Sequence, residues 1–157
     1  MEVIGAESEE PVDSSEILDL INDYKDKNNV FIQVFNPSLV VGKEHLIWAY
    51  NKAKKTFENE NNRASDIGIE TLLWASAEWQ IKNALKKMGI QGKIKKIAMI
   101  TDADINDLLD HLDFNRNDDI LMTSEKKLKE FGIEYDDVAP VERPEDLIFE
   151  KMATSIL

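Results

Sequence analysis

The sequence has no cysteine and no long apolar run. The absence of cysteine excludes disulfide bonds, thiol nucleophiles and cysteine metal ligands. The longest unbroken apolar run, LIWAY at 46–50, has five residues, whereas a membrane-spanning helix needs roughly 20. The acidic start, MEVIGAESEEPVD, lacks the basic and apolar segments of a signal peptide. Together these absences predict a cytoplasmic protein with no membrane partner.

Glycine and proline are also scarce, at 6 and 4 of 157 residues. No internal repeat or low-complexity tract is present, which argues against repeat architectures and linkers. Hydrophobic residues make up 43% and charged residues 32% of the chain. This balance is typical of a globular protein, and the length suits one domain with a substantial core. We therefore expect a single domain over residues 1–157.

Positive charge is scarce overall but concentrated in one stretch. The formal net charge is -12. Between Lys43 and Lys96 there are 11 basic and 6 acidic residues, a local balance of +5, which leaves -17 for the rest of the chain. Such asymmetry suggests one face for an anionic partner. The alternative is that the acidic loops only keep the protein soluble.

Periodicity predicts several helices and a few strands. Apolar residues at helical spacing indicate helices over 13–27, 43–57, 65–75, 78–88, 103–112, 124–132 and 143–157. Runs rich in β-branched and apolar residues indicate strands over 29–35, 93–101 and 118–123. The expected fold is therefore α/β (α+β), with a small mixed sheet packed against several helices.

Capping residues place several helix ends. Glu16 follows Asp13 at the spacing of a capping box. Ser76 is expected to cap the helix over 78–88, and Gly89 to end it. Asp102 is expected to cap the helix that follows it.

Motifs for known chemistries are absent. The pair Gly42-Lys43 lacks the first glycine and the hydroxyl residue of a phosphate-binding P-loop. His45 and His111, the two histidines, have no partner at a metal-binding spacing, so packing roles are expected for both. No serine lies in a nucleophile elbow. We expect a protein that is not an enzyme and needs no cofactor or metal.

One acidic pair leaves an alternative open. Asp102 and Asp104 follow a predicted strand, an arrangement that can hold Mg²⁺ in a phosphate-handling enzyme. The competing interpretation gives both carboxylates a helix-capping role at the positive end of the helix dipole. We favour capping, because no third ligand accompanies the pair.

The predicted helix over 78–88 is strongly amphipathic. Its apolar stripe consists of Ile81, Ala84, Leu85 and Met88, and the opposite side carries Lys82, Lys86 and Lys87. These lysines are either a solvated face or, with Lys43, Lys52 and the GKIKK segment at 92–96, a set that positions phosphates.

Three tryptophans occupy the same basic stretch. Trp48 and Trp74 lie in apolar runs and are expected in the core. Trp79 lies in the predicted first turn of the 78–88 helix, where an exposed indole among lysines can stack on an unpaired base.

The segments HLIWAYNKA and ETLLWASAEWQIKNALKKMGI resemble the small non-catalytic subunit of the KEOPS complex, the TPRKB or PRPK-binding protein family. The similarity covers about residues 28–100, and the C-terminal KMATSIL is also similar. In that family the small subunit binds an atypical kinase subunit and the 3′ CCA end of tRNA. The complex installs threonylcarbamoyl on the adenosine beside the anticodon, with the chemistry carried by other subunits.

The resemblance therefore implies two partners, the kinase subunit and tRNA. The expected tRNA-binding residues are Lys43, Lys52, Trp79, Lys82, Lys86 and Lys87. The expected kinase-binding residues are Met88 and Ile90, unless both are buried at the helix stop. An adaptor that binds only protein is the main alternative, and the Mg²⁺-dependent enzyme ranks below it.

One departure from the family pattern concerns the turn before the 78–88 helix. Archaeal members usually have Gly-x-Arg-Gln-Ile there, whereas this chain has Ala77-Glu78-Trp79-Gln80-Ile81. A tryptophan thus replaces the arginine. Stacking of Trp79 on a base is one way in which RNA contact would survive.

Overall fold

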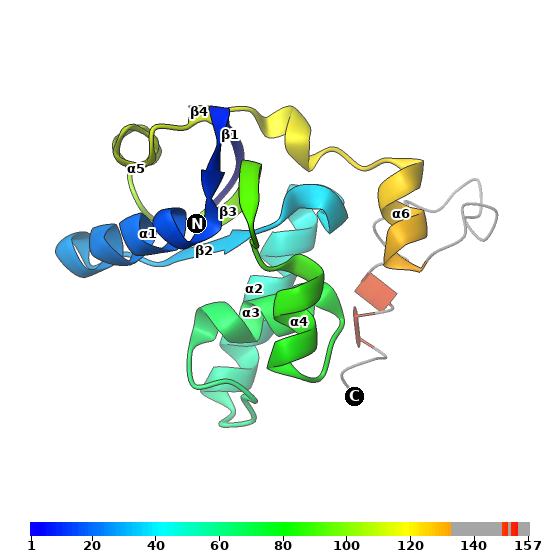
Figure 1. The fold of residues 1–157 in the computed structure, drawn as a ribbon. Coiled ribbons are helices and arrows are strands. Elements are labelled where there is room, and N and C mark those ends of the chain that lie inside the picture. Colours follow the sequence, from blue (N-terminus) through cyan, green and yellow to red (C-terminus); the bar gives the residue numbers. More distant parts are fainter. Residues whose placement is uncertain (133–148, 151, 154–157) are drawn as a thin grey trace.

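The computed structural model describes residues 1–132, 149, 150, 152 and 153. Its elements are β1 (Glu2–Asp13), α1 (Ser14–Asn28), β2 (Ile32–Phe35), η1 (Pro37–Leu39), α2 (Lys43–Glu58), α3 (Ile67–Ser76), α4 (Ile81–Met88), β3 (Lys93–Thr101), α5 (Ile105–Leu112), β4 (Asn115–Arg116), η2 (Asp118–Leu121) and α6 (Glu125–Phe131). The α/β class predicted from sequence is confirmed (Figure 1). Most of the helix predicted over 143–157 lies outside the described residues.

The four strands form one sheet in the order β2-β3-β1-β4. All three strand pairs are antiparallel, so the expected mixed sheet is antiparallel among the described strands. Val3 of β1 and Gln33 of β2 both pair with Ile100 from opposite sides. β3 therefore lies at the centre of the sheet, bonded along both edges.

Strand β1 was missed by sequence reasoning. Residues 3–6 are all buried, so they show no alternation of apolar and polar side chains. Beyond them the strand is acidic, and its register against β3 shifts between Glu7 and Val12. The strand predicted over 118–123 was also wrong, because residues 118–121 form the short helix η2.

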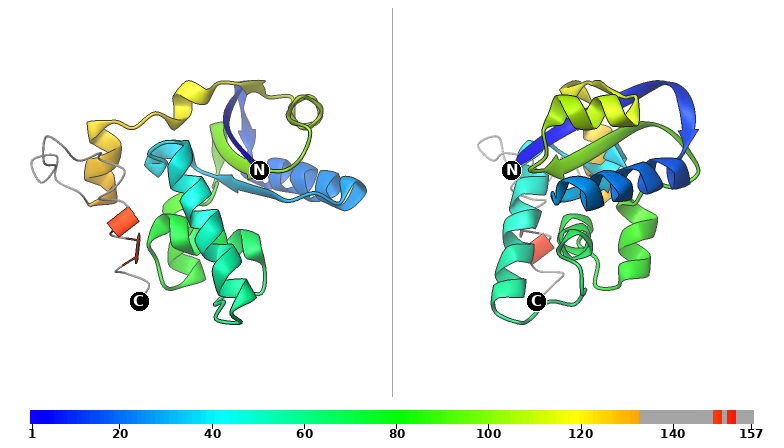
Figure 2. Two further views of the ribbon diagram at one scale, coloured as in Figure 1. Left: turned by 180° about the vertical axis from the view of Figure 1, so that it is seen from behind. Right: turned by 90° about the vertical axis from the view of Figure 1, so that its left-hand side faces the viewer.

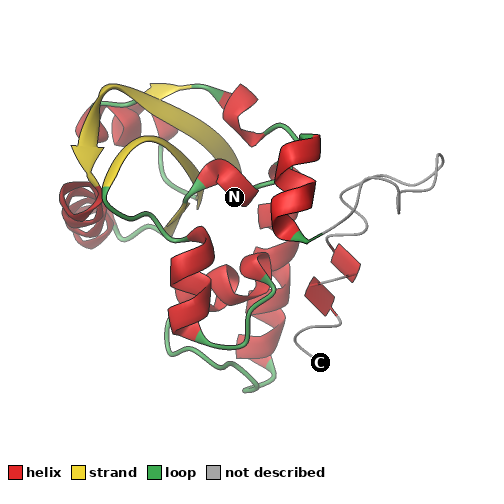
Figure 3. Cartoon of the chain, turned by 45° about the vertical axis from the view of Figure 1, so that its right-hand side comes forward, coloured by secondary structure: helices red, strands yellow, loops and turns green. Residues whose placement is uncertain are grey.

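Two hydrophobic clusters lie on opposite faces of the sheet. Successive residues of β3 divide between them, Ile97 and Met99 joining one cluster and Ala98 and Ile100 the other. The first cluster includes α1 and α5, and the second includes α2, α3 and α4. Helices thus cover both faces, with α2–α4 forming a layer below the sheet (Figures 2 and 3).

Several helix ends differ from the sequence prediction. Ser76 closes α3 and does not cap α4, which starts at Ile81 after Gln80. Asp104, not Asp102, caps α5 by accepting a hydrogen bond from Asp107 N. Asp13 precedes α1 as predicted but forms no side-chain cap. Gly89 ends α4 as predicted. The position requires glycine because a Cβ there would lie 2.5 Å from Leu85 O.

His45 ties the start of α2 to the end of α3. Its side chain is completely buried, and its Nδ1 accepts a hydrogen bond from Val41 N at 3.1 Å. Nδ1 is therefore unprotonated, and Nε2–H donates to Ala75 O at 2.8 Å. Burial lowers the pKa of His45 from 6.5 to about 4, so the ring is neutral at pH 7. His45 thus has the expected packing role, as a buried side chain with two hydrogen bonds.

We expect His45 to make folding sensitive to acid. Between about pH 6.5 and pH 4, the His45 side chain is protonated in the unfolded state but stays neutral in the folded state. The free energy of unfolding therefore falls by about 3 kcal/mol as the pH is lowered through this range. His45→Gln should cost about 1–3 kcal/mol at pH 7, because Val41 N is left without its acceptor. It should also flatten the pH dependence of urea unfolding over this range.

The matched control is His111→Gln, since His111 is exposed and its change should leave that acid dependence in place. An unaltered pH slope in His45→Gln would contradict the prediction.

Candidate functional site

A cavity of about 380 Å³ lies where the end of α2, the following loop and the turn before α4 meet. It is lined by cationic, amide and aromatic side chains, namely Lys52, Lys55, Thr56, Asn59, Asn61, Arg63, Trp74 and Trp79. Among the described residues, no carboxylate lines it. The cavity therefore combines positive charge with aromatic rings, within the basic stretch of the sequence.

A buried carboxylate holds the loop that forms one wall of this cavity. Glu70 on α3 is fully buried, and its Oε1 accepts hydrogen bonds from Arg63 N at 2.8 Å and Ala64 N at 3.0 Å. Thr56 Oγ1 of α2 donates to the other oxygen at 3.2 Å. One side chain thereby joins α2, the loop and α3.

Arg63 lies between two indoles. Its guanidinium carbon is 5.3 Å from the ring centroid of Trp79 and 5.8 Å from that of Trp74. Nη1 donates to Glu78 O at 3.1 Å, which fixes the guanidinium at the turn before α4. Arg63, from the loop before α3, thus places a guanidinium beside the turn that carries Trp79.

Two donors at this cavity are unsatisfied. Trp74 Nε1 and Arg63 Nη2 are buried, and neither has a hydrogen-bond partner within the described part of the chain. A buried donor without an acceptor costs about 1–3 kcal/mol.

The three tryptophans divide as the sequence suggested. Trp74 is buried and Trp48 partly buried, and their rings meet edge to face with centroids 5.8 Å apart. Trp79 is 53% exposed. It precedes α4 and does not lie in the helix's first turn, contrary to the sequence prediction.

The structure brings together only some of the predicted tRNA-binding residues. Lys52 and Trp79 line the same cavity. Lys82 and Lys86 are exposed on α4, which starts directly after Trp79 and Gln80.

The other two predicted lysines are engaged elsewhere. Lys43 is the first residue of α2 and pairs with Asp118 at 3.0 Å, at the opposite end of the helix from the cavity. Lys87 turns inward, donating to Ser76 O at 2.8 Å and lying 4.3 Å from the ring centroid of Phe131. It also pairs with the carboxylate of Glu78 at 3.7 Å.

Comparison with known protein families identifies the chain's relatives. The family model described as kinase binding protein CGI-121 matches residues 12–154. The chain belongs to this family. The KEOPS small-subunit resemblance is thereby confirmed, as is the kinase-binding character of the family. No curated protein matches the chain, and no helix in the described residues is long and apolar enough to cross a membrane.

The two residues expected to bind a kinase are not on the surface of this CGI-121 family member. Met88 and Ile90 are buried, and they belong to the two clusters on opposite faces of the sheet. Their burial at the end of α4 agrees with the alternative stated for these two residues in the sequence analysis. Two other residues of the apolar stripe on α4 have exposed side chains, Ile81 with 40% and Leu85 with 41% of its surface accessible.

Asp102 and Asp104 both have backbone partners. Asp102 Oδ1 accepts from Phe31 N at 2.8 Å, which links the end of β3 to β2. Asp104 Oδ1 accepts from Asp107 N at 3.0 Å as the cap of α5. In the part of the chain that the structure describes, no group of three or more acidic or histidine side chains could hold a metal ion. The capping interpretation fits Asp104, and Asp102 has a different structural role.

We expect Glu70→Ala to destabilise the protein by at least about 2 kcal/mol, because it leaves the buried N–H groups of Arg63 and Ala64 without an acceptor. Glu70→Gln should cost less, since an amide oxygen still accepts from both. Thermal unfolding followed by tryptophan fluorescence measures both effects.

Glu58→Ala, at an exposed position of α2, is the matched control. Equal unfolding temperatures for Glu70→Ala and Glu58→Ala would contradict the anchoring role.

Proposed function

We propose that this protein is a non-catalytic KEOPS subunit that binds an atypical protein kinase and the single-stranded 3′ CCA end of tRNA. In this role it supports threonylcarbamoyl modification of tRNA, with catalysis on other subunits. The kinase-binding half rests on family membership. The tRNA half rests on the cavity around Arg63, Trp74 and Trp79.

The observation that carries the tRNA half is an exposed indole in a cationic cavity. An unpaired base stacks on an exposed aromatic face without regard to sequence. Trp79 offers such a face, with the guanidinium of Arg63 on its ring. The ammonium groups of Lys52 and Lys55, which line the same cavity, suit acceptors on a base or phosphate.

Local charge explains how an acidic protein would hold RNA. Lys52, Lys55 and Arg63 line the cavity, and Lys82 and Lys86 extend the positive surface along α4. At physiological salt the Debye length is about 8 Å, so a phosphate here is influenced mainly by these neighbours. The net charge of -12 is concentrated outside residues 43–96.

The kinase half needs apolar surface away from the RNA cavity. Ile81 and Leu85 lie one turn apart on α4, and Leu85 lines a separate cavity with Leu18 of α1. Both leucines are about two-fifths exposed. Exposed apolar side chains of this kind form the centre of protein interfaces. This strip is the proposed kinase contact in place of Met88 and Ile90.

The deciding experiment measures binding of the purified protein to tRNA, intact and lacking its 3′ CCA, at two salt concentrations. We expect binding that requires CCA and weakens with salt, with log affinity falling by about 0.7 per phosphate contacted for each log unit of salt. Kinase binding without binding to either tRNA would leave the protein-only adaptor.

Trp79→Ala should weaken binding to a CCA-ending RNA by about 1–3 kcal/mol, the range for one stacked base. The unfolding temperature should change little, because the side chain is 53% exposed. Trp79→Phe is the matched control and should retain most of the affinity, since it keeps an aromatic face. Unchanged affinity in Trp79→Ala would exclude stacking there.

Leu85→Asp should weaken kinase binding by about 1–2 kcal/mol, because it places a charge within a buried apolar contact. Met122→Asp, at a 65% exposed position on another surface, is the control. Calorimetric titration with the kinase subunit measures both. Equal affinities for the two variants would remove the strip from the interface.

A further inference from the structure

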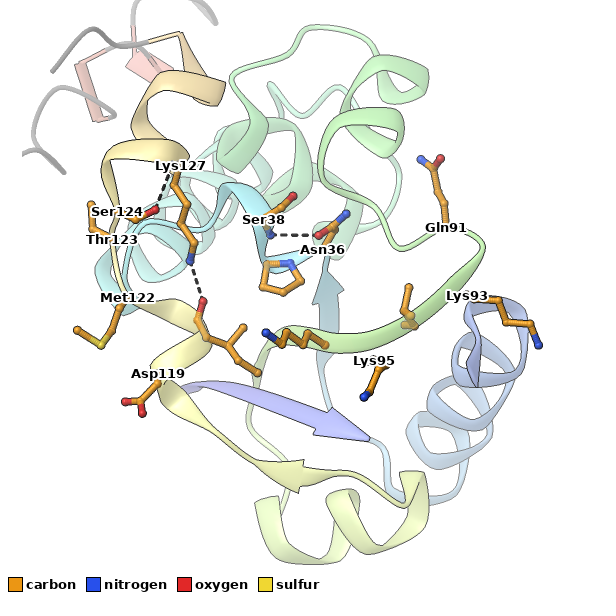
Figure 4. Close-up of a pocket in the computed structure, with 14 residues that line it drawn as sticks. Asn36, Ser38, Gln91, Lys93, Lys95, Asp119, Met122, Thr123, Ser124 and Lys127 are labelled. Carbon is orange, nitrogen blue, oxygen red and sulfur yellow. Dashed lines mark hydrogen bonds between the residues drawn. The ribbon is translucent and has the colours of Figure 1, made fainter. Parts of the chain in front are cut away.

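A second cavity, larger than the proposed CCA site, lies apart from it. It measures about 710 Å³ and lies between the first half of β3, η1, η2 and the start of α6 (Figure 4). Four lysines line it, namely Lys93, Lys95, Lys96 and Lys127. Three of them come from the GKIKK segment, which the proposed function leaves without a role.

Lysines outnumber carboxylates in this cavity, although Glu7 lies opposite Lys96 in the sheet. Asp119 is the one carboxylate among its described lining residues. Within the described part of the chain, Lys95, Lys96 and Lys127 form no ion pair, whereas Lys93 pairs with Asp13 at 3.4 Å. Figure 4 shows Lys93 directed away from the cavity, toward α1. The effective charge comes from the other three lysines.

The side chain of Lys127 is held in the wall of the cavity by two hydrogen bonds. Its Nζ donates to Val40 O at 2.8 Å and to Ile120 O at 2.7 Å, which holds the ammonium group between η1 and η2. Burial first, and then the nearby charge of Lys96, lower the pKa of Lys127 to about 8. An anion between these two lysines would relieve both effects.

The position of α4 connects this cavity with the first one. The helix begins after Trp79 and Gln80 at the proposed CCA site, and it ends at Met88, shortly before Gln91 of the large cavity. Eight residues span about 12 Å. Lys82 and Lys86 are exposed along this length. Two exposed lysines therefore lie on the helix that runs from one cavity toward the other.

We infer that the large cavity, with Lys95, Lys96 and Lys127, binds backbone phosphates of the same RNA on the 5′ side of its CCA end. This inference rests on the proposed function. Lysines without base-reading groups hold phosphates irrespective of sequence. The CCA site would thus bind the unpaired end, and this second site the strand that leads to it.

The test compares intact tRNA with the trinucleotide CCA, using Lys95→Met/Lys96→Met, whose side chains are both exposed. We expect the variant to bind tRNA more weakly and its salt slope to fall by about 1 for each phosphate that the protein no longer neutralises. Affinity for CCA should stay at the wild-type value. Fluorescence anisotropy at two salt concentrations measures both.

Lys25→Met/Lys27→Met is the matched control, because it removes two charges from the end of α1 and from neither cavity. It should leave affinity for tRNA unchanged. An equal decrease in tRNA affinity for the two double variants would mean a general charge effect and would overturn the inference.

The remaining outcomes separate the two proposals. Wild-type tRNA affinity in Lys95→Met/Lys96→Met would overturn the second site and leave the CCA site standing. Failure of the wild-type protein to bind CCA or tRNA would overturn both. Inorganic triphosphate that raises the unfolding temperature only when both lysines are present, with tRNA binding unaffected, would assign the cavity to a free phosphate compound instead.

Discussion

The buried carboxylate of Glu70 is the interaction on which the candidate site depends. A charged group without solvent is tolerated only where several donors converge on it. Here two backbone N–H groups of the 59–66 loop and a hydroxyl of α2 do so. These hydrogen bonds hold the loop on a path that places the Arg63 guanidinium beside both Trp74 and Trp79.

Burial on both faces of the sheet fixes where the helices lie. Because β3 is buried on both faces along its second half, helices must cover each side. The α2–α4 layer then presents the aromatic cavity and the basic side of α4, and Ile81 and Leu85 form a neighbouring apolar strip. One short helix thus borders both proposed partners, which would couple kinase docking and RNA binding in space.

Much of the fold was predictable where periodicity is strong. The extents of α1, α2, α6 and β3 match the sequence prediction closely, because each combines an apolar pattern with end signals, whereas β2 begins three residues later than predicted. Strand β1 was hidden because burial on both faces removes alternation. The start of α4 was placed three residues too early, because Ala77 ends α3 in a left-handed conformation, with φ of 58°, although it is not glycine.

The sequence by itself determined the family, the absence of a recognisable catalytic motif, and the concentration of positive charge between Lys43 and Lys96. These follow from residue types and their order. Only the tertiary structure decided which of those charges act together. Lys87 faces inward and Lys43 pairs with Asp118, whereas Arg63 joins Trp79 across a loop. Such groupings depend on contacts between residues distant in sequence, which local periodicity does not encode.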